Sequence, residues 1–191
     1  MEHSILLNFL SSLQLLFVGF IPAAVAGILL GSAIGINPLL YQLCKRLLQI
    51  PYSIPPIAFV PLAFIFFKEV EVAASIVVFF SAIWAVIINT ATGMRKSRLQ
   101  DNNFRVAINY IFDALRTGLW IAWFTVIAIE MLTIGRGLGF LIWNGYRGGN
   151  YNKIIEGLIY IGTIGFLLDQ LLDITGNLLA KIVSEGQKSD D

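Results

Sequence analysis

Several ionisable side chains lie inside long apolar stretches of this 191-residue chain, and five of them are the first candidates for chemistry. They are Arg116, Glu130, Glu156, Asp169 and Asp173. An ionisable residue within a membrane span is costly and is therefore a functional candidate by default. Asp169 and Asp173 are one helical turn apart, and a carboxylate pair can serve acid–base chemistry. Nothing else in the sequence supports enzyme chemistry, so polar contacts near the lipid headgroups are the favoured interpretation of this pair.

Other kinds of site lack the residues they need. His3 is the only histidine and Cys44 the only cysteine, which argues against a His/Cys metal site or a Cys–His nucleophile pair. Gly135, Gly137 and Gly139 follow no predicted strand and precede no Lys-Ser/Thr pair, so they do not form a nucleotide-binding loop. We therefore predict no catalytic residue, no metal, no cofactor and no ATPase within the chain. The net charge of +1 gives no reason to expect nucleic acid.

One helical face combines charge with aromatic rings. Arg116, Trp120, Trp123, Ile127 and Glu130 share this face by the i, i+4, i+7 spacing. Arg116 and Glu130 are separated by ~21 Å along a helix, so they cannot pair with each other. Two interpretations remain open. The face lines a transport path, or the charges lie near the helix ends and have partners on neighbouring spans.

The segment QIPYSIPPIAFVP predicts a broken or kinked helix. Its prolines, at positions 51, 55, 56 and 61, remove backbone donors and cannot all fit a regular helix. Irregular backbone at membrane depth is tolerated only under protein or along a water-filled cavity, and broken helices often mark transport sites. A proline-bent packing helix is the alternative. The candidates for lining a translocation path are thus Pro55, Pro56, Arg116, Trp120, Trp123 and Glu130.

The elements that must position these residues are membrane spans. The chain is 57% hydrophobic and 13% charged, whereas soluble domains carry about 25% charged residues. A spanning helix needs ~20 mostly apolar residues. We expect an all-α, polytopic membrane protein with a single transmembrane domain over residues 1–191. Its predicted spans are about 8–35, 46–67, 72–94, 108–132 and 153–181.

Basic residues predict the orientation of these spans. The turn between the first two spans, the loop at 95–107, the start of the fourth span and the C-terminal tail hold nine Lys and Arg, against four on the opposite side. We expect the C-terminus in the cytoplasm and the N-terminus outside. The segment 133–152, with a short helix over Leu138–Trp143, should rest at the outer interface. The start Met-Glu-His lacks a basic region, which argues against a cleavable signal peptide.

The first span carries small residues at a four-residue spacing, which makes one smooth ridge on a helix. Packing within the chain is the first interpretation, and a subunit contact or a pore wall is the alternative. The ridge consists of Gly19, Ala23, Gly27, Gly31 and Gly35.

Several segments together resemble the permease subunits of binding-protein-dependent ABC importers. The resemblance is strongest to the nitrate, bicarbonate, sulfonate and taurine group, and to its cyanobacterial nitrate and bicarbonate members. It covers nearly the whole chain, in the right order. The matching segments are SSLQLLFVGFIPAAVAGILLGSAIG, LLQIPYSIPPIAFVPLAFIFF, INTATGMR, NYIFDALRTGLWIAWFTVIAIEML, GLGFLIWNGY and IIEGLIYIGTIGFLLDQLL.

The resemblance implies a type I importer core of five helices in the lipid bilayer, without the additional N-terminal helix common in the family. It further implies a second permease subunit, either a copy of this chain or a longer relative. Two ATPase subunits and an external solute-binding protein complete such an importer. The implied function is a translocation path for a small anion such as nitrate or bicarbonate, with Arg116 as one positive group. The implied location is the inner membrane of the cell, or a thylakoid membrane if the source is cyanobacterial.

The loop at 95–107 departs from the family. In the family this loop contains a Glu-Ala-Ala motif, a glycine and a proline, and its short helices dock on the ATPase. This chain has no glycine between Gly93 and Gly118 and no proline after Pro61. The alternative function is therefore a permease-derived structural or regulatory subunit of a larger membrane complex, not coupled to ATP. The remnant of the coupling loop comprises Arg95, Lys96, Arg98, Asp101, Arg105 and Ala107.

Overall fold

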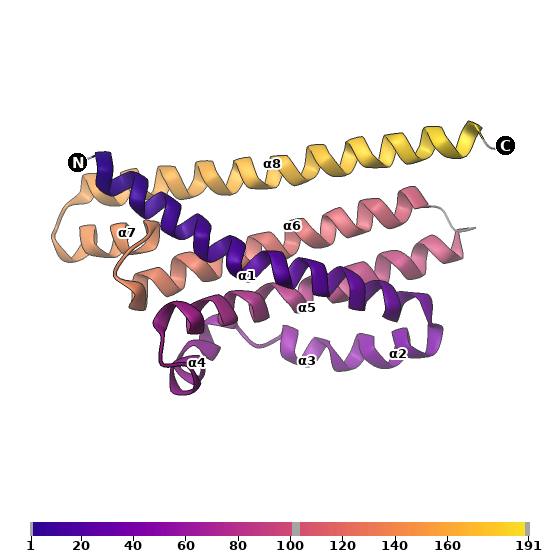
Figure 1. Cartoon of the computed structure of the whole chain (residues 1–191), viewed down its shortest axis with the longest axis horizontal. Helices are drawn as coiled ribbons and strands as arrows, with labels where there is room; N and C mark the ends of the chain where they lie inside the picture. The colour runs from indigo at the N-terminus through magenta and orange to yellow at the C-terminus, as the bar shows by residue number, and fades with distance from the viewer. Residues whose placement is uncertain (1, 101–103, 190–191) are drawn as a thin grey trace.

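The computed structural model describes residues 2–100 and 104–189, and nearly all of them are helical (Figure 1). The long helices are α1 (Glu2–Ile36), α5 (Val70–Leu99), α6 (Phe104–Ile129) and α8 (Tyr151–Ser189). The shorter ones are α2 (Pro38–Leu47), α3 (Gln49–Tyr52), η1 (Pro56–Phe59), α4 (Val60–Phe66), the π-helical η2 (Glu130–Ile134) and α7 (Leu138–Arg147). No strand occurs among the described residues, which confirms the all-α prediction.

The long helices form an elongated bundle. Helices α1 and α6 both pack on α5, and α8 lies along α6 at the outside of the bundle (Figure 1). In the described residues, 4 helices are long and apolar enough to cross a membrane, and a bent pair of shorter ones makes up to 5. This agrees with the five predicted spans. Leu16, Val78, Val126 and Ile129 are among the fully buried side chains at the centre of the bundle.

The ridge of small residues on α1 lies against α5. A Cβ atom built on Gly19 or Gly27 would come within 2.7 Å of Val78 or Val86 side-chain atoms on α5. At Gly31 it would come within 2.7 Å of the Ile87 carbonyl oxygen. The two backbones therefore approach too closely for larger residues on the ridge. In this chain the ridge serves packing between two of its own helices.

The second span begins earlier than predicted. Asn37 accepts hydrogen bonds from the N–H groups of Leu39 and Leu40, and Pro38 occupies the first helical turn. An Asn cap followed by proline favours the start of a helix at this position. Lys45 and Arg46, which we expected in a turn, thus lie on the last turn of α2. The helix pair Pro38–Tyr52 and Pro56–Phe66 is bent by 72°, so the predicted break occurs at the Pro55-Pro56 pair.

The predicted loop at 95–107 is wrong in its bounds. Helix α5 continues to Leu99 and α6 begins at Phe104, which leaves only 100–103 between them. Lys, Arg, Met and Leu favour helices, and the segment offers neither glycine nor proline to end α5 earlier. Arg95, Lys96 and Arg98 therefore lie on α5, and Arg105 and Ala107 on α6. Asp101 lies outside the described residues.

The remaining spans are longer than predicted at most of their ends. Helix α1 reaches Glu2, and α8 extends from Tyr151 to Ser189. The fourth span ends in the π-turn of η2, closed by Gly135 in the left-handed conformation (φ 72°). The short helix predicted at Leu138–Trp143 is present as α7 and continues to Arg147.

Candidate translocation path

The break in the second span opens a pocket of about 480 Å³. The irregular segment Pro51–Pro56 forms one wall, and side chains of α5 and α6 form the other. Most of the lining is aromatic or aliphatic, and its hydroxyl groups belong to Tyr52, Ser53 and Ser81. The pocket-lining aromatic residues are Tyr52, Phe59, Phe80, Trp84, Trp120 and Phe124.

The pocket has few polar groups, and two of its three hydroxyls already donate hydrogen bonds to backbone carbonyls. Ser81 Oγ donates to the Val78 carbonyl at 2.7 Å, and Ser53 Oγ donates to the Gln49 carbonyl at 2.7 Å. The rings of Phe80 and Trp84 stack with centroids 6.3 Å apart. None of the lining residues carries a charge. The pocket is therefore weakly polar and aromatic, and its lining residues carry no fixed charge that would hold an ion tightly.

The predicted path residues do not all meet there. Pro55, Pro56 and Trp120 line the pocket, whereas Arg116, Trp123 and Glu130 are not among its lining residues. Successive residues of a helix are rotated by about 100°, so Trp120 on α6 and Glu130 at the start of η2 lie about 80° apart around the common helix axis and face different neighbours. The single polar face expected on this helix is thus divided between two sides. Sequence reasoning missed Trp84 and Phe80, whose aromatic type alone does not distinguish a pocket wall from a core.

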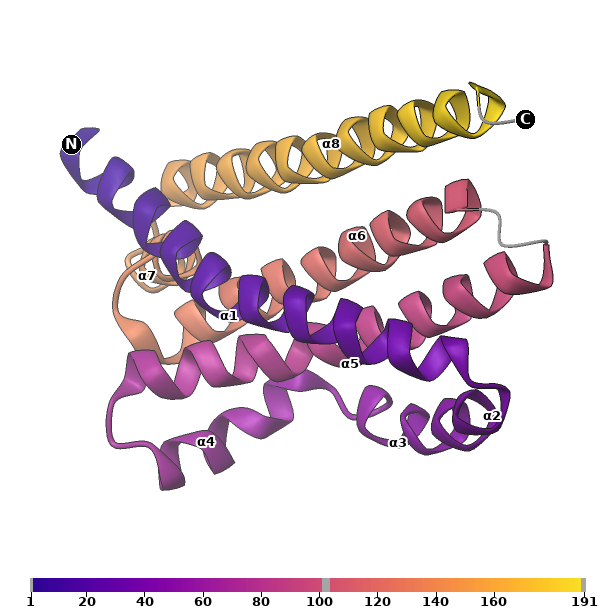
Figure 2. The same ribbon diagram turned by 45° about the vertical axis from the view of Figure 1, so that its right-hand side comes forward.

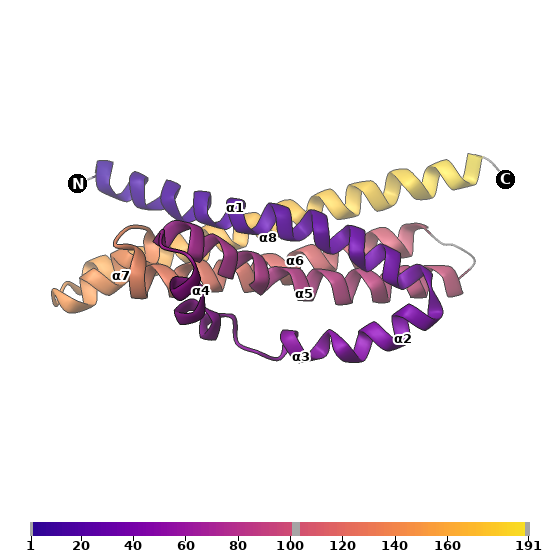
Figure 3. The same ribbon diagram turned by 60° about the horizontal axis from the view of Figure 1, so that its bottom comes forward.

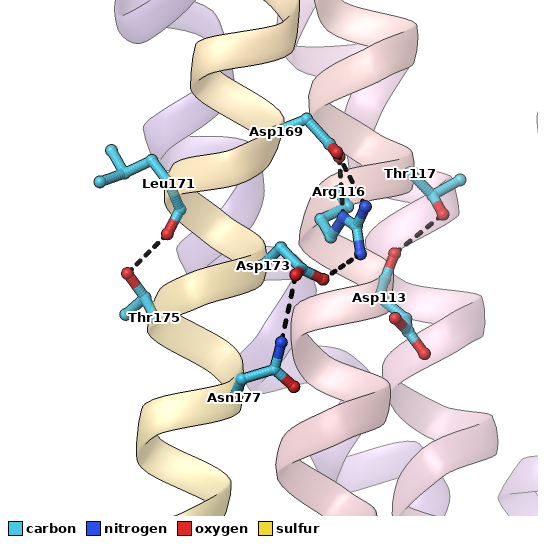
Figure 4. Close-up of polar contacts among 8 residues, drawn as sticks. All are labelled: Asp113, Arg116, Thr117, Asp169, Leu171, Asp173, Thr175 and Asn177. Carbon is cyan, nitrogen blue, oxygen red and sulfur yellow. Dashed lines mark hydrogen bonds and ion pairs between the residues drawn. The ribbon is translucent and has the colours of Figure 1, made fainter.

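Arg116 is held by two carboxylates of α8 (Figure 4). Its Nε and Nη2 donate to the two carboxylate oxygens of Asp169 at 2.7 and 2.8 Å, and its Nη1 donates to Asp173 Oδ1 at 2.5 Å. Asn177 donates to the other oxygen of Asp173 at 3.1 Å. The carboxylate pair therefore fixes α8 on α6. Arg116 lies about 18 Å from the start of α6, so it is further into the helix than expected for a helix-end charge.

Removing the guanidinium should loosen α8. Arg116→Gln leaves two neighbouring carboxylates without a cation, and we expect a cost of about 1–2 kcal/mol after allowance for solvent screening. The midpoint of thermal unfolding in detergent should fall by ~2–6 °C. The triple variant Arg116→Gln, Asp169→Asn, Asp173→Asn removes the repulsion and should recover part of the loss. A triple variant less stable than the single one would show that the repulsion is not the cause.

Trp123 also joins α6 to α8. Its side chain is 4% exposed, and its Nε1 donates to the Ile161 carbonyl at 3.3 Å. A Cβ atom on Gly165 would lie 3.1 Å from that nitrogen, so Gly165 makes room for the indole ring. The large ring and the small residue opposite it are typical of helix–helix packing.

Glu130 binds the start of α7. The carboxylate is 1% exposed, and its Oε2 accepts from Ser12 Oγ and from the Gly139 N–H, both at 2.9 Å. Ser12 Oγ accepts from the Leu138 N–H at 2.9 Å, and Asn8 Oδ1 accepts from the Gly137 N–H at 2.9 Å. These side chains satisfy the N–H groups that the first turn of a helix leaves free. Ser12 and Asn8, which sequence reasoning missed, belong to this cluster.

The comparisons with known proteins agree with this architecture. A nitrate import permease protein of Leptolyngbya laminosa is 34% identical over 195 residues, covering 93% of this chain and 69% of the relative. A nitrate import permease protein of Synechocystis sp. is 36% identical over 88% of this chain and 68% of the relative. The chain belongs to the nitrate and bicarbonate permease family of ABC importers. A bicarbonate transport system permease protein of Synechococcus elongatus is 34% identical over 85% of this chain and 65% of the relative. No protein-family model matches the sequence.

The alignment with the Leptolyngbya permease runs over 195 residues, although this chain has 191 and is covered to 93%. The relative therefore has residues within the aligned region that this chain lacks. The relatives are transport permeases by name, and the apolar helices make this permease-like subunit a membrane protein.

Proposed function

We propose that this permease-like subunit forms part of the translocation path for a small anion, such as nitrate or bicarbonate. The observation that carries the proposal is the aromatic pocket at the broken second span, in a chain whose relatives are nitrate and bicarbonate permeases. Broken spans at membrane depth are typical of transport sites because their backbone faces a cavity. Pro55, Pro56 and Trp120 are the path residues in this proposal.

The proposal includes partners and an orientation. A second permease subunit, two ATPase subunits and an external binding protein complete the importer. Basic residues occur at one end of the bundle, on the last turn of α2, at the end of α5 and at the start of α6. That end is assigned to the cytoplasm by the positive-inside rule, which leaves α7 and the N-terminus outside. The inner membrane of the cell is the proposed location, with a thylakoid membrane as the alternative.

A second candidate function follows from the short connection between α5 and α6. Only 100–103 separate the two helices, at the position where the family resemblance implies the ATPase-docking helices. The second candidate is a permease-derived structural or regulatory subunit that does not couple to ATP. In an importer with two different permease subunits, a longer relative would then supply the docking loop.

One isolation experiment tests the proposal. The tagged chain is purified from its native membranes in mild detergent, and its partners are identified by mass spectrometry. The importer role predicts an ATPase subunit and a solute-binding protein in the complex, with ATP hydrolysis that rises when the binding protein and nitrate or bicarbonate are added. A stable complex without any nucleotide-binding subunit would overturn the importer role and support the second candidate.

A further inference from the structure

Helices α2 and α3 carry an exposed polar stripe beside an exposed apolar one. Gln42, Lys45, Arg46 and Gln49 are all exposed, and their spacing of three and four residues places them on one face. The neighbouring face of the same helices is apolar and also exposed. It consists of Leu39, Leu43, Leu47 and Ile50, which are 55–77% exposed.

The two helices run lengthwise beside α5 rather than across the end of the bundle (Figures 2 and 3). Near the start of α2, Tyr41 Oη lies 3.3 Å from Thr92 Oγ1 of α5. About 16 Å further along the helix axis, Tyr52 lines the same pocket as Trp84 of α5. The polar stripe therefore leads from the basic end of the bundle to the proline break.

The stripe does not fit a lipid-facing position. Lys45 and Arg46 form no ion pair among the described residues, and Lys45 Nζ lies 5.7 Å from the centroid of the Tyr41 ring. A Lys or Arg at the centre of a spanning helix costs ~2.5–3.5 kcal/mol, and less near its end. A hollow of about 910 Å³ follows the stripe and is lined by all four of its residues, together with Tyr41 and the neighbouring Leu39, Leu43 and Leu47. Water in that hollow would solvate both charges.

The geometry points to a water-filled mouth of an anion path, formed by Gln42, Lys45, Arg46 and Gln49. This inference rests on the proposed function, because it extends the same path from the aromatic pocket to the basic end of the bundle. Two cations at the mouth raise the local concentration of an anion. The amide of Gln49 and the hydroxyl of Tyr52 offer hydrogen-bond donors further in. The pocket at the proline break carries no charge, so it would bind the anion weakly and allow it to dissociate.

Thiol labelling tests this inference in membranes that contain the full chain. Single cysteines are introduced as Gln49→Cys and Ile50→Cys in a Cys44→Ser background, and opened membranes are treated with negatively or positively charged methanethiosulfonate reagents. Gln49→Cys should react ~10-fold faster than Ile50→Cys, because Ile50 belongs to the exposed apolar face and does not line the hollow. At Gln49→Cys the negative reagent should react several-fold faster than the positive one, because Lys45 and Arg46 attract it. This preference should decrease at high salt.

Neutral substitutions give the decisive comparison. Lys45→Gln with Arg46→Gln should abolish the preference for the negative reagent, whereas the matched control Lys68→Gln, on an exposed residue at the other end of the bundle, should leave it unchanged. Equal labelling at positions 49 and 50, or a preference that persists in the double variant, would overturn the proposed water-filled mouth. This outcome can be told apart from a failure of the proposed function. If only the importer role were wrong, Gln49→Cys would still prefer the negative reagent, but the purified chain would contain no ATPase subunit.

Discussion

Gly31→Leu should separate α1 from α5 and produce one of the largest losses of stability of any single substitution in this chain. A Cβ atom at this position would lie 2.7 Å from the Ile87 carbonyl oxygen and 2.7 Å from Thr90 Cβ. The carbonyl belongs to the backbone of α5 and cannot rotate away, so one helix has to move. Overpacking of this kind costs about 3 kcal/mol or more. The midpoint of thermal unfolding in detergent should fall by ~6–12 °C.

The matched control is Gly162→Leu on α8. A Cβ atom at Gly162 meets nothing within 4 Å, although the residue is also a helical glycine. The substitution should leave the unfolding midpoint nearly unchanged, because leucine favours the helix more than glycine does. Equal losses at positions 31 and 162 would mean that the stability depends on glycine content and not on the close approach of α1 and α5.

The sequence predicts this fold well because the physical causes are local. Apolar length identifies the spans, the prolines identify the break, and the four-residue spacing from Gly19 to Gly35 identifies a close helix contact. The predicted bounds are less accurate at 95–107, where the charged residues favour a loop in the sequence but, among the described residues, are helical in the structure. Lys and Arg are good helix formers, so α5 extends through Arg95, Lys96 and Arg98.

The candidate site was harder to predict because its geometry depends on contacts between distant segments. Arg116 finds its carboxylates 53 and 57 residues further along the chain. Glu130 finds Ser12 at a separation of 118 residues. Helical spacing shows which residues share a face, but it does not show which other helix covers that face. Arg116 is paired because α8 brings Asp169 and Asp173 beside it. Trp120 lines a pocket because the break near Pro55 leaves space next to α6.

Glu130→Ala should release the start of α7 from α1 and from the end of α6. The substitution leaves the Gly139 N–H without its acceptor in a buried position, and it leaves the Ser12 hydroxyl only its longer contact with the Asn8 carbonyl at 3.2 Å. An unsatisfied buried donor costs about 1–3 kcal/mol, and the vacated volume adds to the loss. We expect a total of ~3–5 kcal/mol. Amide hydrogen exchange over Leu138–Arg147 should accelerate more than exchange in α5.

Two further variants separate the carboxylate from general effects. Glu130→Gln keeps the volume and one acceptor oxygen, so it should lose less stability than Glu130→Ala. Glu71→Gln removes a carboxylate whose ion pair with Arg136 is exposed, with side chains 61% and 48% exposed, and such surface pairs contribute about 0–1 kcal/mol. If exchange in α7 were as fast in Glu71→Gln as in Glu130→Ala, the buried hydrogen bonds of Glu130 would not be what holds α7. Slow exchange in Glu71→Gln with fast exchange in Glu130→Ala would assign the positioning of α7 to Glu130 and Ser12.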